Sequence, residues 1–251
     1  MGPPAAVAAV IFDWGGTLTP WHDIDGAEIF RRVAATLVTD PADAADVERV
    51  ALALYTAEEA AWALARTEHR SGTIHDSIRA AGHDPTEAAL DAWYLGYEPH
   101  TYADPEAHAV LTGLRERGIK VGILSNTGFP RTWHEEIFAR DGLLALVDGA
   151  VYTSEIPWVK PHPAAFKAAM AAVGVTDPAA VVFVGDRLFD DIHGAKSVGM
   201  RAVWIPHSRI PSEQRGHTDG EPDAVIERLS DLLPVVDGWT RPSQRLSRTP
   251  S

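Results

Sequence analysis

Short runs of apolar residues recur along the chain, and polar residues do not alternate with the apolar ones inside them. Runs of this kind are typical of strands that are covered on both faces, as in a parallel sheet. The predicted strands are Ala6 to Phe12, Ile119 to Leu124, Ala150 to Tyr152, Val181 to Val184 and Ala202 to Ile205.

Helical patterns lie between the later runs. Asp104 and Pro105 supply a helix start, apolar residues follow at helical spacing from Ala107 to Leu114, and Gly118 stands where a helix-ending glycine belongs. The same arrangement recurs at Pro163 to Val173 and at Asp191 to Val198. Because strands and helices alternate, we predict an α/β body with a parallel sheet and crossover helices.

Residues 21 to 100 follow a different pattern, because their apolar positions keep helical spacing and no convincing strand occurs. We therefore predict a helical insert over residues 21–100, placed between two parts of one α/β core, residues 1–20 and 101–239. Residues 240–251 contain several Arg, Ser and Pro and almost no apolar residue, which predicts a flexible tail.

Composition limits the partners of the protein. With 251 residues, of which 45% are apolar, the chain can bury a large core. Its 22 basic and 35 acidic residues give a net charge of −13, which repels nucleic acids and anionic lipid surfaces. We therefore expect no nucleic-acid or membrane partner. The first apolar run is too short to span a bilayer and no basic segment precedes it, so we expect a cytoplasmic protein.

The absence of cysteine excludes disulfides, thiolate nucleophiles and sulfur-ligated metals. The side chains left as metal ligands are His, Asp and Glu, together with backbone oxygen. This set favours a hard cation over zinc.

Reactive side chains follow the predicted strands. In a parallel α/β sheet, ligands bind at the carboxyl ends of the strands, so these residues are expected to converge. They are Asp13, Ser125 to Thr127, Lys160, Asp186, Asp190 and Asp191. A nucleophile, cation ligands and charge-neutralising donors together suit phosphoryl transfer.

Four segments, in this order along the chain, resemble the four motifs of the haloacid dehalogenase-like (HAD) superfamily of hydrolases. They are FDWGGTLT, ILSNTG, KPHPAAF and VGDRLFDDIHGAKSVGM, of which the last is the most specific. The resemblance implies a doubly wound parallel sheet of the Rossmann-like kind. It also implies that the helical insert is the cap domain that these enzymes place over the active site.

The resemblance also implies roles for single residues. Asp13 would be the nucleophile that becomes an aspartyl-phosphate, and Ser125 and Lys160 would complete the catalytic set. The phosphate of a small phosphorylated substrate would bind to Ser125, Asn126, Lys160 and the backbone of Trp14 and Gly15. Mg²⁺ would be held by Asp13, the backbone carbonyl of Gly15, Asp186 and Asp191. Asp191 would bind the cation through water, or orient Lys160.

Gly15 departs from the pattern of HAD phosphatases, which commonly carry a second aspartate there. That aspartate protonates the leaving oxygen and later activates water, and the loss of a general acid or base typically lowers the rate about 10²–10⁴-fold. A phosphatase would need a good leaving group, help from its substrate, or an acid from elsewhere, such as His22 or Asp23.

Two other interpretations stay open. One is a non-catalytic or very slow protein that binds a phosphorylated ligand, and the other is a 2-haloacid dehalogenase. Dehalogenases of the superfamily have a bulky aromatic at position 15 and lack the acid that Asp186 provides here. Phosphonate-cleaving relatives use a cap lysine, whereas the first lysine of this chain is Lys120, beyond the insert.

Overall fold

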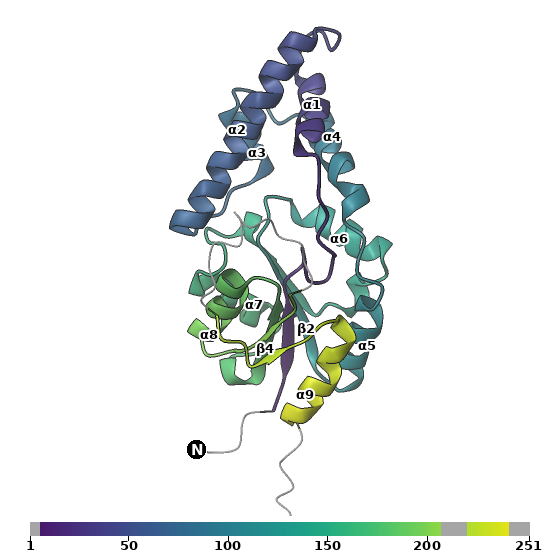
Figure 1. Ribbon diagram of the computed structural model, residues 1–251, viewed down its shortest axis with the longest axis vertical. Helices are drawn as coiled ribbons and strands as arrows, with labels where there is room; N and C mark the ends of the chain where they lie inside the picture. The colour runs from purple at the N-terminus through teal and green to yellow at the C-terminus, as the bar shows by residue number, and fades with distance from the viewer. Residues whose placement is uncertain (1–5, 207–219, 241–251) are drawn as a thin grey trace, which may run out of the picture.

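A parallel sheet of six strands forms the centre of the computed structural model, which describes residues 6–206 and 220–240 (Figure 1). The strands are β1 (Ala9–Phe12), β2 (Lys120–Ser125), β3 (Gly149–Tyr152), β4 (Val181–Gly185), β5 (Arg201–Trp204) and β6 (Ala224–Val225). Their order is β3-β2-β1-β4-β5-β6, so β1 lies between β2 and β4. The predicted parallel α/β sheet is confirmed; β6 escaped prediction, because two residues give no periodicity.

Both faces of the sheet are buried. Val10 and Phe12 belong to one hydrophobic cluster, whereas their neighbours Ala9 and Ile11 belong to the cluster on the opposite face. Since successive strand side chains point to opposite faces, a strand covered on both faces needs apolar residues at every position. This is why β1 is an unbroken apolar run.

Helices cover the two faces in separate groups, as Figure 1 shows. One group consists of α5 (Ala107–Glu116), α6 (Arg131–Arg140) and α9 (Leu232–Thr240), and the other of α7 (Pro163–Ala172) and α8 (Gly194–Ser197). A π-helical turn, η5 (Leu188–His193), replaces the first part of the helix predicted from Asp191. The remaining short turns are η1 (Glu98–His100), η2 (Leu144–Leu146), η3 (Thr153–Glu155), η4 (Pro178–Ala180) and η6 (Leu229–Asp231).

Four helices between β1 and α5 form a separate hydrophobic cluster away from the sheet. They are α1 (Gly26–Leu37), α2 (Ala44–Glu68), α3 (Ile74–Ala80) and α4 (Glu87–Tyr97). Phe30, Leu54 and Trp93 are buried in this cluster. Side chains of Asp25, Asp43, Thr73 and Thr86 cap the four N-termini. None of the described helices combines the length and apolar character that a membrane crossing requires.

The connection between α2 and α3 joins this helical part to the sheet body. The backbone N–H of Val159 donates to the carbonyl of His69 at 2.9 Å, and Ser71 N–H donates to the carbonyl of Pro157 at 3.2 Å. Ile74 N–H donates to the carbonyl of Gly128 at 3.2 Å. The helices therefore stand beyond the carboxyl ends of the strands and are tied to two loops there (Figure 1).

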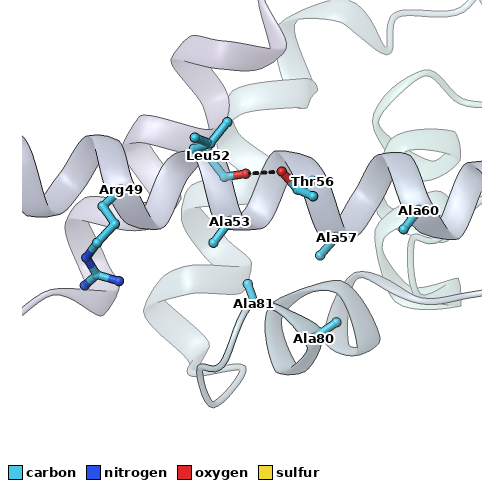
Figure 2. A pocket seen from close by; sticks show the side chains of 8 residues that line it. All are labelled: Arg49, Leu52, Ala53, Thr56, Ala57, Ala60, Ala80 and Ala81. Atoms are coloured by element: carbon cyan, nitrogen blue, oxygen red, sulfur yellow. Dashed lines mark hydrogen bonds between the residues drawn. The ribbon is translucent and has the colours of Figure 1, made fainter.

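A shallow groove of about 510 Å³ lies between α2 and α3 (Figure 2). Most of its lining side chains are alanines, which are too small to fill the space between the two helices. The lining residues are Arg49, Leu52, Ala53, Thr56, Ala57, Ala60, Ala80 and Ala81. None of them is a predicted site residue, so this groove is not the candidate site.

Candidate active site

Asp13 follows β1 and lies at the centre of the carboxyl edge of the sheet. Its backbone N–H continues the sheet by donating to Val184 O at 2.9 Å. The chain then turns sharply, because Gly16 adopts a φ of 86° and its N–H donates to Thr19 O at 2.7 Å. This turn holds the Asp13 carboxylate at the end of the strand, where it is only 7% exposed.

Lys160 connects Asp13 to Asp191. Its ammonium donates to Asp13 Oδ1 at 2.6 Å and to Asp191 Oδ1 at 2.7 Å, and all three side chains are buried. Burial opposes the charge of Lys160, but the two carboxylates raise its pKa above the ordinary value, so it is an ammonium ion. Burial raises the pKa of Asp13 to about 6, against the opposing effect of Lys160. The pair is therefore charged at neutral pH in a place that water scarcely reaches.

Three buried carboxylates converge in the same place. Oxygen atoms of Asp13, Asp186 and Asp191 all lie within 4.8 Å of one another. Asp186 follows β4, the neighbour of β1, and Asp191 follows in the η5 turn. An all-oxygen set of buried carboxylates, whose charges repel one another, fits a hard divalent cation. The residues expected to hold Mg²⁺ are thus compatible with that ion.

Gly185 allows Asp191 to come this close. A Cβ atom built on Gly185 would lie 2.3 Å from Asp191 Cγ, far inside van der Waals contact. Asp191 Oδ2 is also fixed, because it accepts the Arg187 N–H at 2.9 Å. The position of Asp191 thus depends on the absence of a side chain at residue 185.

The loop after β2 brings Ser125 to the same edge. Ser125 is buried beside Tyr152 of β3. Within residues 6–206 and 220–240, its hydroxyl makes no hydrogen bond, so it is available to a ligand.

The Asn126 side chain, in contrast, binds the backbone of Lys160. Asn126 Oδ1 accepts from Lys160 N–H at 2.8 Å, and Asn126 Nδ2 donates to Lys160 O at 3.1 Å. Both polar groups of the amide are used in this way. The Asn126 side chain therefore positions Lys160, while its second amide N–H and its backbone N–H take no part in these two bonds.

His134 packs beneath this loop and was not among the predicted site residues. It is fully buried, its Nε2 lies 3.1 Å from Thr127 Oγ1, and its ring stacks on Tyr152. The His134 and Trp14 rings meet edge to face at a centroid distance of 4.7 Å. Burial lowers the pKa of His134 to about 3, so it is neutral. His134 precedes the apolar residues 137 and 138 by three and four positions, so it lies on the same face of the helix. This spacing is the sequence signal that could have predicted its burial.

Arg187 is a second residue that sequence reasoning missed. It directly follows Asp186, and its side chain is 34% exposed, near Asp190 at 3.7 Å. Its positive charge acts on Asp13 and opposes the rise in the pKa of that carboxyl. The sequence signal that could have identified Arg187 is its place as a basic residue within an acidic motif.

The two side chains considered as alternative acids lie elsewhere. His22 and Asp23 are exposed, and the His22 ring lies 5.6 Å from that of His100. Among the described residues, neither one belongs to the buried carboxylate cluster. At Gly15 itself, a Cβ atom would meet nothing within 4 Å. Position 15 therefore has room for a Cβ atom, but this chain carries no side chain there.

Comparisons with known proteins show the family and the fold of the chain. The family described as haloacid dehalogenase-like hydrolase matches residues 7–199. A glyceraldehyde 3-phosphate phosphatase of Methanopyrus kandleri is 30% identical over 239 residues, which is 92% of this chain and 97% of that protein. A phosphonoacetaldehyde hydrolase of Pseudomonas putida is 29% identical over 285 residues, 98% of this chain and 96% of that protein. The crystal structure of a HAD phosphatase from Thermococcus onnurineus covers 92% of this chain and 99% of its own, with a TM-score of 0.64 and 23% identity, and shows the same fold.

Proposed function

The chain belongs to the haloacid dehalogenase-like hydrolases, as its motifs indicated, and from this premise we propose that it is a magnesium-dependent phosphatase of a small phosphorylated metabolite. The observation that carries the proposal is the buried cluster at the carboxyl edge of the sheet. There a carboxylate, Asp13, is held by Lys160 beside two further carboxylates. These two further carboxylates are those of Asp186 and Asp191.

In this proposal, Asp13 is the nucleophile. Lys160 keeps the Asp13 carboxylate oriented and balances the negative charge of the incoming phosphate. The Ser125 hydroxyl and the backbone N–H groups of Trp14, Gly15 and Asn126 donate to phosphate oxygens. The catalytic step is attack of an Asp13 oxygen on phosphorus, which gives an aspartyl-phosphate that water hydrolyses.

Asp13, Asp186, Asp191 and the backbone carbonyl of Gly15 would hold Mg²⁺. When bound, the cation would neutralise charge on the phosphoryl oxygens. Asp191 also orients Lys160, with which it is in direct contact. This contact supports a role of Asp191 in orienting Lys160, and its place among the three carboxylates supports a role at the cation.

We propose that residues 21–100 act as a cap that selects the substrate. Their connection at residues 69–74 contacts both the loop that follows Ser125 and the loop that precedes Lys160. The name of the Methanopyrus kandleri relative makes glyceraldehyde 3-phosphate the first substrate to test. Cleavage of a phosphonate through an imine is not proposed, because the sequence has no lysine before Lys120.

The direct test is phosphate release from p-nitrophenyl phosphate and acetyl phosphate, with Mg²⁺ or with EDTA. We expect release that requires Mg²⁺ and that Asp13→Asn abolishes. Asp91→Asn, an exposed aspartate of α4, is the matched control and is expected to keep full activity. Absence of release by the wild-type protein would contradict the proposal and favour a binding-only protein. Metal-independent chloride release from 2-chloropropionate would instead favour a dehalogenase.

A further inference from the structure

The backbone of Arg187 is fixed within the acidic loop. Its N–H donates to Asp191 Oδ2 at 2.9 Å, and its carbonyl accepts from the N–H groups of Asp191 at 3.0 Å and Ile192 at 3.2 Å. The Arg187 side chain therefore extends from a backbone segment that hydrogen bonds hold in place next to Asp186.

The guanidinium of Arg187 keeps most of its donors for a ligand. It lies 3.7 Å from the Asp190 carboxylate and 5.8 Å from the centre of the Trp21 ring. Within the described parts of the chain, it donates no side-chain hydrogen bond. Since a guanidinium carries five N–H donors, these weak contacts leave it able to bind an oxyanion.

Arg187 and Lys160 differ in what they can offer a substrate. The Lys160 side chain is 2% exposed and is committed to Asp13 and Asp191, whereas Arg187 is 34% exposed. In an in-line displacement, the leaving oxygen lies opposite the attacking oxygen, across phosphorus. It therefore points away from Asp13. Arg187, which directly follows Asp186, is more exposed than Lys160 and lies 5.8 Å from the centre of the Trp21 ring.

We propose that the Arg187 guanidinium donates a hydrogen bond to the leaving oxygen of the phosphate ester, and so supplies part of the stabilisation that Gly15, without a side chain, cannot give. The inference rests on the proposed phosphatase function. Arg187 directly follows Asp186 and its backbone N–H binds Asp191, so its side chain starts at the edge of the carboxylate cluster, and its charge also acts on Asp13. The preorganised donor stabilises the negative charge that develops on the leaving oxygen.

The step balances without a general acid. An Asp13 oxygen bonds to phosphorus, the ester P–O bond breaks, and its electron pair stays on the leaving oxygen. Arg187 keeps its protons, and the alkoxide takes a proton from water and leaves hydroxide. Water then adds to phosphorus and frees the Asp13 carboxylate and dihydrogen phosphate, which neutralises the hydroxide. The net reaction gives an alcohol and hydrogen phosphate from an ester and water.

Leaving-group dependence tests the proposal. We compare Arg187→Met with wild type on glycerol 3-phosphate, which releases a poor leaving group, and on p-nitrophenyl phosphate, which releases a good one. The expected loss of kcat/KM is about 10²–10³-fold for glycerol 3-phosphate and less than about tenfold for p-nitrophenyl phosphate. Equal losses on both substrates, or no loss, would overturn the proposal. Arg187→Lys keeps the charge and is expected to recover part of the loss.

Two further variants sharpen the comparison. Arg79→Met is the matched control, because Arg79 also lies 3.7 Å from an aspartate three residues away but is on α3. It is expected to leave both substrates unaffected. Gly15→Asp restores the missing acid, so it should raise turnover of glycerol 3-phosphate. In that background the loss from Arg187→Met should fall below about tenfold; an undiminished loss counts against the proposal.

The two proposals fail in different ways. If wild type releases no phosphate from either ester in Mg²⁺, the phosphatase function is wrong. If wild type does release phosphate but Arg187→Met, folded by circular dichroism, affects both esters equally, only the role of Arg187 is wrong.

Discussion

At the scale of single residues, the cluster combines strong attraction with strong desolvation. Asp13 and Lys160 attract each other at 2.6 Å, but burial disfavours a charged Asp13 more than Lys160 favours it. A buried carboxylate placed in this way lowers stability, which is common at functional sites. The consequence is a measurable dependence of stability on pH.

The pKa of Asp13 is raised from 3.8 to about 6 by burial, so the folded state binds a proton that the unfolded state has lost. In EDTA, the stability of wild type relative to Asp13→Asn should therefore fall as pH rises from about 4 to about 6, by at most about 3 kcal/mol, and stay constant above. Urea unfolding of both proteins at a series of pH values measures this difference. If the difference in stability between the two proteins does not change with pH, burial does not raise the pKa of Asp13.

Gly185 is the second residue for which the structure gives a specific prediction. Gly185→Ala places a Cβ atom 2.3 Å from Asp191 Cγ, so Asp191 must move away from Lys160. We expect destabilisation of about 1–3 kcal/mol together with a large loss of activity. Gly15→Ala is the control, because a Cβ atom there meets nothing within 4 Å. Equal effects of the two substitutions would refute the steric argument.

At the scale of elements, the helical part depends on its own buried residues. α1 packs against both α2 and α4, and Trp93 of α4 is fully buried, with its ring perpendicular to that of Phe30 at 5.5 Å. No strand of the sheet contributes to the cluster around Trp93, although Phe129 and Trp133 of the sheet body pack against it. None of the three buried carboxylates belongs to this cluster, so a substitution at Trp93 acts first on the helices.

Trp93→Ala should lower the free energy of unfolding by about 3–5 kcal/mol, because it removes a large buried ring and leaves a cavity. Leu95→Ala, two residues further on the same helix, removes a side chain that is 63% exposed. It should change stability by less than about 0.5 kcal/mol. Chemical unfolding of both variants makes the comparison, and a small effect of Trp93→Ala would mean that the cluster is loosely packed.

At the scale of the whole molecule, acidic charge dominates. The net charge is −13, and three buried carboxylates meet at one edge of the sheet. A divalent cation bound there would relieve this repulsion only in the folded state, because only folding brings the three together. Binding to the folded state alone stabilises a protein by mass action.

Mg²⁺ should therefore raise the midpoint of thermal unfolding, with a gain of about 2.7 kcal/mol at a concentration one hundred times the Kd. Asp186→Asn removes one carboxylate of the cluster and should reduce this gain strongly. Differential scanning fluorimetry with MgCl₂ or EDTA provides the measurement. A midpoint that Mg²⁺ leaves unchanged in wild type would contradict a cation site at this edge.

The sequence by itself determined the parallel sheet, most of its strands, the presence of Asp13, Ser125 and Asp186 at strand ends, and that of Lys160 in the loop after β3. Apolar runs and helix-ending glycines are local signals, and a residue after a parallel strand always reaches the same edge of the sheet. The order of the motifs was therefore enough to predict which residues converge. It was also enough to show that position 15 lacks an acid.

Only the tertiary structure decided which hydrogen bonds and contacts the residues of the site make. It assigned the Asn126 side chain to the backbone of Lys160, buried His134 beneath Thr127, and placed Arg187 within electrostatic reach of Asp13. Each contact joins segments whose relative placement depends on strand register and on how the loops cross the sheet edge. Local spacing carries no information on such distances, so these contacts became visible only once the chain was folded.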